Sequence, residues 1–353
     1  MDIYYYGKQI YQFSYSKPIY DELGGSFIVY KNRNWMEFKY YLRGLNKDPN
    51  YKSFLNTPPV LVRDYNQLDD LKGVLLTHSA RKLNTNREQC KTIYLGHGSG
   101  DKVFGGKGAN MDSYDYYFLP GPKMHEKLLD VGKNIPEERL IKIGNPRFDD
   151  LVNGKIDKEK VLDRLGVKNR NLPTVLYAPT WRFGNGTFKR YAYKFAEEIT
   201  KDYNLIIRPH YHDTKRLHKL KLWAKMKGIK NLYFSDSSDL IKADTMLDFA
   251  VSDIMISDTS SVLYEYLITG KPIIIAENGY SKLHNMPDEL NIMNYAHMYY
   301  GKEDLNKMIA DALALQKYKN DYKAMLPRVF YFNDGKSTQR SVDFVKKISE
   351  EVR

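Results

Sequence analysis

The stretch of residues 252–275 constrains the fold of this chain more than any other. A short apolar run at 254–256 is followed by hydroxyl-rich residues 257–261, a helical pattern and a second apolar run at 273–275. Apolar runs this short are typical of strands that are buried on both faces. The stretch therefore predicts a strand–helix–strand unit of a parallel sheet.

The hydroxyl-rich segment allows two interpretations. The first turn of a helix leaves backbone N–H groups free beside the end of the strand, so Thr259, Ser260 and Ser261 are well suited to hold a phosphate group. Serine and threonine also cap helices without binding any ligand. Taken alone, this stretch leaves both interpretations open.

The rest of the chain repeats the same alternation of strand-like and helical patterns. Its 353 residues exceed one average domain, and the alternation in each half favours two parallel sheets wrapped by helices. We expect an α/β fold with two Rossmann-like domains facing across a cleft, at residues 1–155 and 156–335, and a C-terminal helix at 336–353 that packs back on the first domain. The predicted strands are residues 3–6, 26–30, 59–62, 74–77, 92–95, 114–119, 140–143, 174–177, 205–207, 232–234, 254–256 and 273–275.

Composition limits the setting of the protein. Cys90 is the single cysteine, which excludes a disulfide within the chain and favours a reducing, cytosolic compartment. No run of 18 apolar residues occurs, and the charged, tyrosine-rich N-terminus is unlike a signal peptide. We therefore expect a protein that is neither secreted nor membrane-spanning.

The charge indicates polyanionic partners. Lys and Arg number 55 against 43 Asp and Glu, which gives a formal net charge of +12. Nucleic acid, an anionic membrane and phosphorylated substrates all fit this excess.

Residues 215–227 read as a lysine-rich amphipathic helix, which is either interfacial or simply solvated on its polar face. The sequence pattern is the same in both cases. The second interpretation is favoured, because most basic helices of soluble proteins pack an apolar stripe inward and leave the polar face in water.

Four polar clusters follow predicted strands, at residues 97–102, 179–182, 208–212 and 258–261. Ligands of open parallel sheets bind beyond the carboxyl ends of the strands. Two such sheets facing each other would bring all four clusters together. Their common position is stronger evidence for a site than any one cluster.

The histidine of the first cluster, His97, lies between Gly96 and Gly98. A histidine that titrates near neutrality suits proton abstraction from a hydroxyl nucleophile. The alternative is a histidine that is hydrogen-bonded within a tight turn. A glycine-rich run at 105–108 reads as a flexible loop that closes over the cleft.

The basic residues of the other clusters also allow two interpretations. The planar guanidinium of Arg182 matches a diphosphate, or else stacks on Trp181. Arg208 and His210 present donors to a ligand at a strand end, or else Arg208 pairs with a carboxylate.

The sequence predicts neither a metal nor a bound cofactor. The sequence contains no H-E-x-x-H motif and no cysteine cluster, and the pair Asp149 and Asp150 reads more readily as a helix start than as a magnesium site. Neither a P-loop nor a strand-to-helix G-x-G-x-x-G is present.

With these clusters in place, the chain resembles the CDP-glycerol glycerophosphotransferases of wall teichoic acid and capsule synthesis. The resemblance runs from Tyr94 to the C-terminus. The motifs that carry it are HGSGDK at 97–102, GNPRFD at 144–149, LYAPTWR at 176–182, RPH at 208–210, SDIMISDTSSVLYEYLITGKPII at 252–274 and FNDGKSTQR at 332–340.

The resemblance implies a GT-B arrangement and a reaction in which an acceptor hydroxyl attacks the glycerol-bearing phosphorus of CDP-glycerol and CMP leaves. By its motifs, His97 corresponds to the base and His210 to the histidine that steadies the donor phosphates. The donor-binding positions are Thr180, Arg182, Arg208, Asp258, Thr259, Ser260, Ser261 and Glu265. The positions on the phosphate or acceptor side are Gly98, Ser99, Lys102 and Arg147.

Three positions depart from the family pattern. Gly96 stands where Trp is usual, Gly100 where Pro is usual, and Glu265 where Asp is common. Because these positions border the donor and acceptor sites, the resemblance predicts the fold more firmly than the substrate. The short chain suggests an enzyme that adds one or a few units.

The sequence thus predicts a transferase that moves glycerol phosphate, or a related polyol phosphate, from a CDP carrier to a lipid-linked saccharide or polymer. We expect it in the cytoplasm, peripheral on the inner face of the cell membrane, with an anionic membrane surface and no nucleic acid as partners. The alternatives are a nucleotide-sugar-dependent GT-B glycosyltransferase and, less favoured, a basic nucleic-acid- or membrane-binding module without catalysis.

Overall fold

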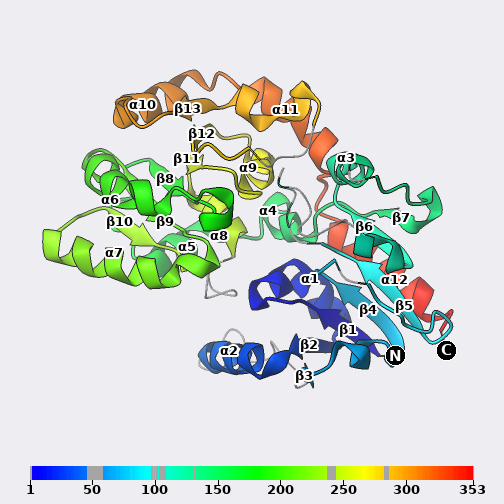
Figure 1. The fold of residues 1–353 in the computed structure, drawn as a ribbon. Coiled ribbons are helices and arrows are strands. Elements are labelled where there is room, and N and C mark those ends of the chain that lie inside the picture. Colours follow the sequence, from blue (N-terminus) through cyan, green and yellow to red (C-terminus); the bar gives the residue numbers. More distant parts are fainter. Residues whose placement is uncertain are drawn as a thin grey trace. The chain divides into compact units, whose positions relative to one another are not determined.

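Two compact units make up the chain in the computed structural model, which describes residues 2–45, 59–80, 82–96, 98, 100, 102, 109–130, 132–236, 244–281 and 286–352. The first unit comprises Met1–His97, Phe104–Asn153 and Phe330–Arg353, and the second comprises Gly98–Val103 and Gly154–Val329. Each unit is built on its own parallel sheet (Figure 1). Gly98, Gly100 and Lys102, which fall within the predicted first domain, belong to the second unit.

The first unit contains a seven-stranded sheet in which every neighbouring pair is parallel. The chain runs outward from β1 to β3, returns to β4 beside β1, and continues outward to β7. The strand order therefore reverses between β1 and β4. The strands are β1 (Ile3–Tyr6), β2 (Ser26–Tyr30), β3 (Val60–Val62), β4 (Gly73–Thr77), β5 (Cys90–Tyr94), β6 (Tyr116–Leu119) and β7 (Leu140–Lys142).

Helices from both ends of the chain cover this sheet. The C-terminal helix α12 packs on α1 and β4, and its first turn is capped by Asp149, whose carboxylate accepts hydrogen bonds from the Ser337 N–H (3.1 Å) and the Thr338 N–H (2.7 Å). Asp149 itself begins α4, so the aspartate pair is a helix start. The helices are α1 (Phe13–Leu23), α2 (Lys31–Leu45), α3 (Pro122–Asp130), α4 (Asp149–Val152) and α12 (Ser337–Ser349).

Tyrosine contributes heavily to the core of the first unit. Tyr94, Tyr114 and Tyr117 are buried, and their ring centroids lie 5.2–6.2 Å apart. Edge-on and tilted contacts of this kind stabilise aromatic cores beyond the area that they bury. Many of the chain's 30 tyrosines therefore serve packing rather than a stacking surface for bases.

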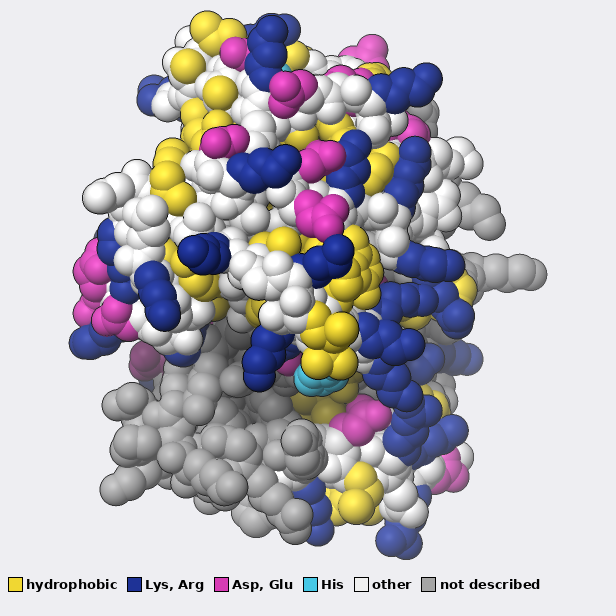
Figure 2. Space-filling view, turned by 90° about the vertical axis from the view of Figure 1, so that its left-hand side faces the viewer, with side chains coloured by type: hydrophobic (Ala, Val, Ile, Leu, Met, Phe, Trp, Pro, Cys, Tyr) yellow, Lys and Arg dark blue, Asp and Glu magenta, His cyan; other side chains and the backbone are white. Residues whose placement is uncertain are grey.

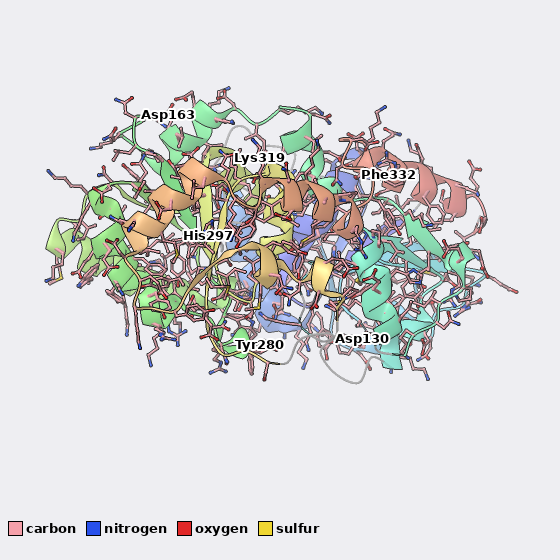
Figure 3. The ribbon with its side chains drawn as sticks, turned by 90° about the horizontal axis from the view of Figure 1, so that it is seen from above. Asp130, Asp163, Tyr280, His297, Lys319 and Phe332 are labelled. Carbon is pink, nitrogen blue, oxygen red and sulfur yellow. The ribbon has the colours of Figure 1, made fainter. Side chains whose placement is uncertain are left out.

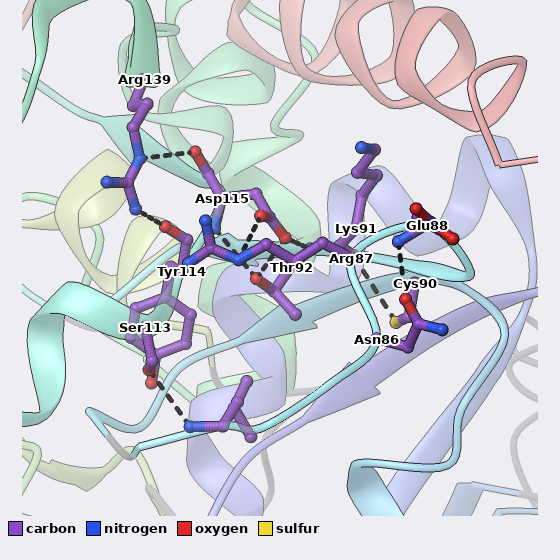
Figure 4. A network of polar contacts seen from close by, with 11 residues as sticks. Asn86, Arg87, Glu88, Cys90, Lys91, Thr92, Ser113, Tyr114, Asp115 and Arg139 are labelled. Atoms are coloured by element: carbon purple, nitrogen blue, oxygen red, sulfur yellow. Dashed lines mark hydrogen bonds and ion pairs between the residues drawn. The ribbon is translucent and has the colours of Figure 1, made fainter.

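A polar network joins β5 to the start of β6 (Figure 4). The Asp115 carboxylate accepts hydrogen bonds from the N–H (2.9 Å) and the hydroxyl (2.8 Å) of Thr92 and pairs with Arg87 at 3.3 Å. Arg139 donates to the backbone carbonyls of Asp115 and Tyr114. The network satisfies polar groups where β6 enters the sheet.

The second unit contains a six-stranded parallel sheet in the order β10-β9-β8-β11-β12-β13. The chain runs outward from β8 to β10, returns to β11 beside β8, and continues to β13, so the strand order reverses between β8 and β11. The sequence did not predict β13, which is short and mostly half-buried. The strands are β8 (Thr174–Tyr177), β9 (Asn204–Ile207), β10 (Leu232–Phe234), β11 (Ile254–Ser257), β12 (Ile273–Ala276) and β13 (His297–Tyr299).

The helices of the second unit bury one stripe each against the sheet. In α7, Leu217, Leu220 and Ala224 recur at helical spacing and are buried. No helix of the described ranges is both long and apolar enough to span a bilayer. The helices are α5 (Lys158–Leu165), α6 (Phe188–Glu198), α7 (Thr214–Lys227), α8 (Thr245–Val251), α9 (Val262–Tyr266), α10 (Leu305–Leu315) and α11 (Lys319–Val329).

Replacing Asp115 by Ala should destabilise the first unit by about 1–3 kcal/mol, because the amide and hydroxyl of Thr92 lose their acceptor in a partly buried setting. Thermal unfolding would show this as a transition that is lower by several degrees. The matched control is Asp112→Ala, which removes an ion pair with Lys133 from a carboxylate that is 63% exposed. Equal effects of the two substitutions would contradict a stabilising role of the network.

Candidate functional site

Three of the four polar clusters meet at one edge of the second sheet. Residues 179–182 follow β8, residues 208–212 follow β9, and residues 258–261 follow β11. Because β9, β8 and β11 are neighbours in the sheet, their carboxyl ends lie side by side. The reversal of strand order between β8 and β11 is the position at which open α/β sheets bind ligands.

The buried carboxylate of Asp258 holds the loop that follows β8. It accepts hydrogen bonds from the Thr180 N–H (2.7 Å), the Thr187 N–H (2.9 Å) and the Thr187 hydroxyl (2.9 Å), and the residue is only 1% exposed. Both carboxylate oxygens are thus bound by the protein itself. Asp258 shapes the site through this loop, in which Thr187 is a partner that the sequence did not reveal.

A second set of hydrogen bonds ties down the same loop at Gly184. Its carbonyl oxygen accepts from the Thr259 hydroxyl (2.6 Å) and from the side-chain amide of Asn278 (2.9 Å). A Cβ atom at Gly186 would overlap the carbonyl of Thr180, so this part of the loop must be glycine. Thr259, which stands where the family usually has tyrosine, therefore anchors the loop.

Lys102 brings a half-buried cation to this loop. Its ammonium donates a hydrogen bond to the Thr180 hydroxyl at 2.7 Å. Burial lowers the pKa of Lys102, and the nearby Asp258 charge opposes that shift. Burial likewise raises the pKa of Asp258 to about 6, against the hydrogen bonds from Thr180 and Thr187 and the charge of Lys102.

The segment that carries Lys102 approaches the start of α9 closely. A Cβ atom at Gly100 would lie 3.1 Å from the Cα of Ser261. A larger residue at this position would push the two backbones apart. Glycine at position 100, where the family usually has proline, thus allows this close approach of the two backbones.

Ser260 and Ser261 differ from Thr259 in having hydroxyl groups without a partner among the described residues. Both residues are half-buried, and neither side chain makes a hydrogen bond to the part of the chain that the structure describes. Ser261 occupies the N-cap position of α9 without a side-chain capping bond. Side-chain capping therefore does not account for these two hydroxyls in the described part of the chain.

A pocket of about 390 Å³ opens beside these hydroxyls. It combines apolar walls with a few polar groups, as small-molecule sites do. The lining residues are Asp258, Thr259, Ser260, Leu263, Ile275, Ala276, Glu277, Asn278, Ile292 and Met293. Asn278 both lines this pocket and holds the loop after β8.

Aromatic rings border the other side of the site. Trp181 stacks on His210 with centroids 5.5 Å apart and planes at 12°, and it also contacts His212 at 4.3 Å. Arg182 is exposed, and its guanidinium lies over Phe183 at 5.1 Å. Trp181 thus orients a histidine, and the arginine that follows it extends toward solvent.

Arg208 and Glu265 are integrated into the fold of the second unit. The Arg208 guanidinium lies 3.1 Å from the Asp248 carboxylate and 3.0 Å from the Ser235 hydroxyl. Asp248 is fully buried, and its burial raises its pKa, which the Arg208 charge opposes. Glu265 is 1% exposed. The carboxylate-pairing interpretation of Arg208 is the one that the structure bears out.

The remaining predicted residues belong to the first unit or lie outside the described residues. Arg147 is buried with its guanidinium 4.4 Å from the Tyr15 ring centroid. His97 and Ser99 lie outside the described residues, as does the loop at 105–108. Gly96 and Gly98 have φ angles of 69° and 85°, which favour glycine.

A buried histidine next to this turn was not predicted. His78, at the end of β4, is 0% exposed, and its Nδ1 lies 2.8 Å from the Gly96 carbonyl. Because a carbonyl only accepts, Nδ1 must carry the proton. Its Nε2 lies 2.9 Å from the Ser16 hydroxyl. His78 thereby fixes the residue that precedes His97 in the chain.

A smaller pocket of about 190 Å³ lies at the opposite ends of β12 and β13, where Pro272, His297, Lys319 and Tyr322 contribute to its lining. Figure 3 labels His297 and Lys319. None of the predicted site residues lines it. Burial lowers the pKa of His297.

Comparisons with known proteins agree with this geometry. Residues 82–347 match the profile of the family described as CDP-Glycerol:Poly(glycerophosphate) glycerophosphotransferase. Teichoic acid glycerol-phosphate primase of Bacillus subtilis (strain 168) is 26% identical over 337 residues, which cover 84% of this chain and 81% of the primase.

A longer relative and a solved structure extend the comparison. Teichoic acid poly(glycerol phosphate) polymerase of Staphylococcus epidermidis is 24% identical over 368 residues, which cover 97% of this chain but only 47% of the polymerase. The solved structure of the wall teichoic acid polymerase TagF has a TM-score of 0.70 at 20% identity and covers 99% of this chain and 89% of that one. The predicted α/β fold of the GT-B type is confirmed by this likeness and by the two parallel sheets.

Asp258→Asn should change the pH dependence of stability. Burial raises the pKa of Asp258 to about 6 in the folded protein, whereas an unfolded aspartate titrates near 4. The folded protein thus binds this proton more tightly, and the resulting stabilisation is complete below about pH 4 and lost as the pH rises through about 6. The loss amounts to about 3 kcal/mol.

Urea unfolding between pH 4 and pH 7 would measure this effect as the difference in free energy of unfolding between the wild type and Asp258→Asn. The difference should fall as the pH rises. Asp288→Asn, at an exposed aspartate of the same unit, is the matched control. A difference that stays constant across this range would show that Asp258 does not titrate there.

Proposed function

Because the chain belongs to the CDP-glycerol:poly(glycerophosphate) glycerophosphotransferase family, we propose that it transfers glycerol phosphate, or a related polyol phosphate, from its CDP carrier in teichoic acid or capsule synthesis. The observation that carries this proposal is that Ser260, which lines a pocket at the reversal of strand order, and Ser261 have hydroxyls without a hydrogen bond to any described residue. Family membership also makes a basic module without catalysis an inferior explanation of the charge.

In this proposal the donor diphosphate binds to the hydroxyls of Ser260 and Ser261. The ammonium of Lys102 would neutralise part of its charge, since it is held by Thr180 within the same cluster. In this proposal the nucleoside part of the donor lies at the pocket that Ser260 lines, which has Ile275 and Met293 among its apolar walls.

Asp258 and Thr259 take an indirect part in donor binding. They hold the loop after β8 through Thr180 and Gly184, so the cations and hydroxyls are in place before the donor arrives. Groups that are fixed in advance stabilise developing charge without the cost of reorganisation. We assign Asp258 and Thr259 as positioning residues for this reason.

The transfer step requires a base for the acceptor hydroxyl. In the proposed step, His97 takes the hydroxyl proton, and the acceptor oxygen forms a bond to the phosphorus that carries glycerol. The bond from that phosphorus to the bridging oxygen breaks, and CMP leaves with this oxygen and its electron pair. Gly98 and Ser99, which follow His97, would lie on the acceptor side.

The other predicted residues support this arrangement to different degrees. His210 is oriented by the Trp181 ring and would bind the phosphate oxygens that leave with CMP. The exposed Arg182 would reach the diphosphate only by turning away from Phe183. Arg208, Glu265 and Arg147 are buried or paired, so we assign them to shaping the site or its surroundings.

The acceptor that fits this family is a hydroxyl of a lipid-linked saccharide or polymer. A cytoplasmic, peripheral position on the inner face of the cell membrane would give the enzyme access to such an acceptor. The relatives that support this assignment are named as teichoic acid enzymes, which include a primase and a polymerase.

Incubation with CDP-glycerol and a lipid-linked acceptor should release CMP, and incubation with UDP-sugars should release no UDP. Release of UDP instead would favour the nucleotide-sugar glycosyltransferase.

In the same assay, His97→Ala should lower turnover by about 10² to 10⁴ if it removes the base. His125→Ala, at a half-buried histidine of α3, is the matched control, and equal rates for the two variants would refute the role of His97.

The double substitution Ser260→Ala and Ser261→Ala should weaken CDP-glycerol binding by about a hundredfold, since each hydroxyl would donate to a charged phosphate. Calorimetry with CDP-glycerol alone measures this without turnover. Ser14→Ala, which removes a hydroxyl bonded to the Tyr11 carbonyl in the first unit, is the control. Unchanged affinity of the double variant would place the diphosphate elsewhere.

A further inference from the structure

The outer face of α7 carries two exposed apolar side chains in a setting that is otherwise cationic. Leu222 is 62% and Met226 is 79% exposed. Lys215, Lys219, Leu222 and Met226 follow each other at spacings of four, three and four residues, so they form one line along the helix, which we term the outer stripe. The helix sequence from Thr214 to Lys227 contains no acidic residue.

The opposite face of α7 is already used for packing. Leu217, Leu220 and Ala224 are buried in the core of the second unit. The outer stripe is therefore not the apolar face that any amphipathic helix buries. Leu222 and Met226 are additional apolar residues, which the fold of this unit does not require.

The lysines beside these apolar residues are available to a partner. Within the described part of the chain, Arg216 pairs with Asp213, and Lys221 lies 3.9 Å from Asp236. By contrast, Lys215, Lys219 and Lys225 make no ion pair with any described residue. Figure 2 views the side on which α7 lies in Figure 1, where lysine and arginine side chains gather next to hydrophobic ones.

We propose that the outer stripe and Lys225 dock on an anionic lipid surface. The lysines would lie among the anionic headgroups, and Leu222 and Met226 would enter the boundary between headgroups and acyl chains. A soluble polyanion would attract the lysines but would gain nothing from the two apolar side chains. An anionic lipid interface uses both kinds of group, and this docking goes beyond the transfer reaction without depending on it.

Sedimentation with vesicles tests the proposal on the full chain without any donor or acceptor. Binding is measured to vesicles of phosphatidylcholine mixed with phosphatidylglycerol, and to phosphatidylcholine alone. We expect binding to the mixed vesicles that weakens at high salt, and much weaker binding to the neutral ones. Binding that ignores both lipid charge and salt would overturn the proposal.

Two sets of variants separate the charged from the apolar contribution. Neutralising three lysines should weaken binding by about a hundredfold, at about fivefold each; the substitutions are Lys215→Gln, Lys219→Gln and Lys225→Gln. Removing the apolar pair should weaken binding at least about tenfold; the substitutions are Leu222→Ser and Met226→Ser. Because all five side chains are exposed, the thermal unfolding of both variants should match the wild type.

Matched controls use exposed residues of α10 and α11. The charge control is Lys307→Gln, Lys319→Gln and Lys323→Gln, and the apolar control is Leu315→Ser, at a side chain that is 71% exposed. Both should bind vesicles like the wild type. If the Leu222 and Met226 variant also binds like the wild type, while the lysine variant loses affinity for both vesicles and soluble polyphosphate, the face binds a polyanion and the proposal is wrong.

Discussion

The buried carboxylate of Asp258 is the interaction on which the candidate site depends. Removing a carboxylate from water is costly unless donors replace the lost hydration. Thr180 and Thr187 supply three hydrogen bonds, and Lys102 supplies a nearby charge. The same bonds fix the loop after β8 against the end of β11. One buried charge thus joins two strands across the reversal of strand order and shapes the surroundings of Ser260.

The sequence predicted most of the sheets because parallel strands buried on both faces read as short apolar runs. Residues 3–6, 26–30, 174–177 and 232–234 coincide with β1, β2, β8 and β10. It missed β13, because the triplet His-Met-Tyr is half-buried at a sheet edge and carries no such run. It also missed α11, which contains Pro327 near its end and so lacks a clear helical signal.

The positions of the candidate site residues could be predicted from the sequence, but their interaction partners could only partly be predicted. Strand ends and sequence motifs are local features, and together they pointed to Thr180, Asp258 and Ser260. The partners of these residues are not local: Arg208 pairs with Asp248, 40 residues away, and His78 contacts Gly96, 18 residues away. Such pairs arise from the order of the strands, which no local pattern records. A motif residue such as Asp258 therefore has partners within the protein that the motif does not reveal.

The cationic side chains of the second unit fall into two groups that differ in how far they are buried. Lys102 and Arg208 are half-buried and held by specific oxygens, which suits them to a fixed role at the strand ends. Lys215, Lys219 and Lys225 of α7 are exposed and make no ion pair with any described residue, which suits a diffuse anionic surface. The two regions are continuous in the chain, because the short turn Tyr211–Asp213 connects His210 to the first residue of α7. If the acceptor is attached to a lipid, as proposed, this continuity would place the proposed docking helix only four residues after His210.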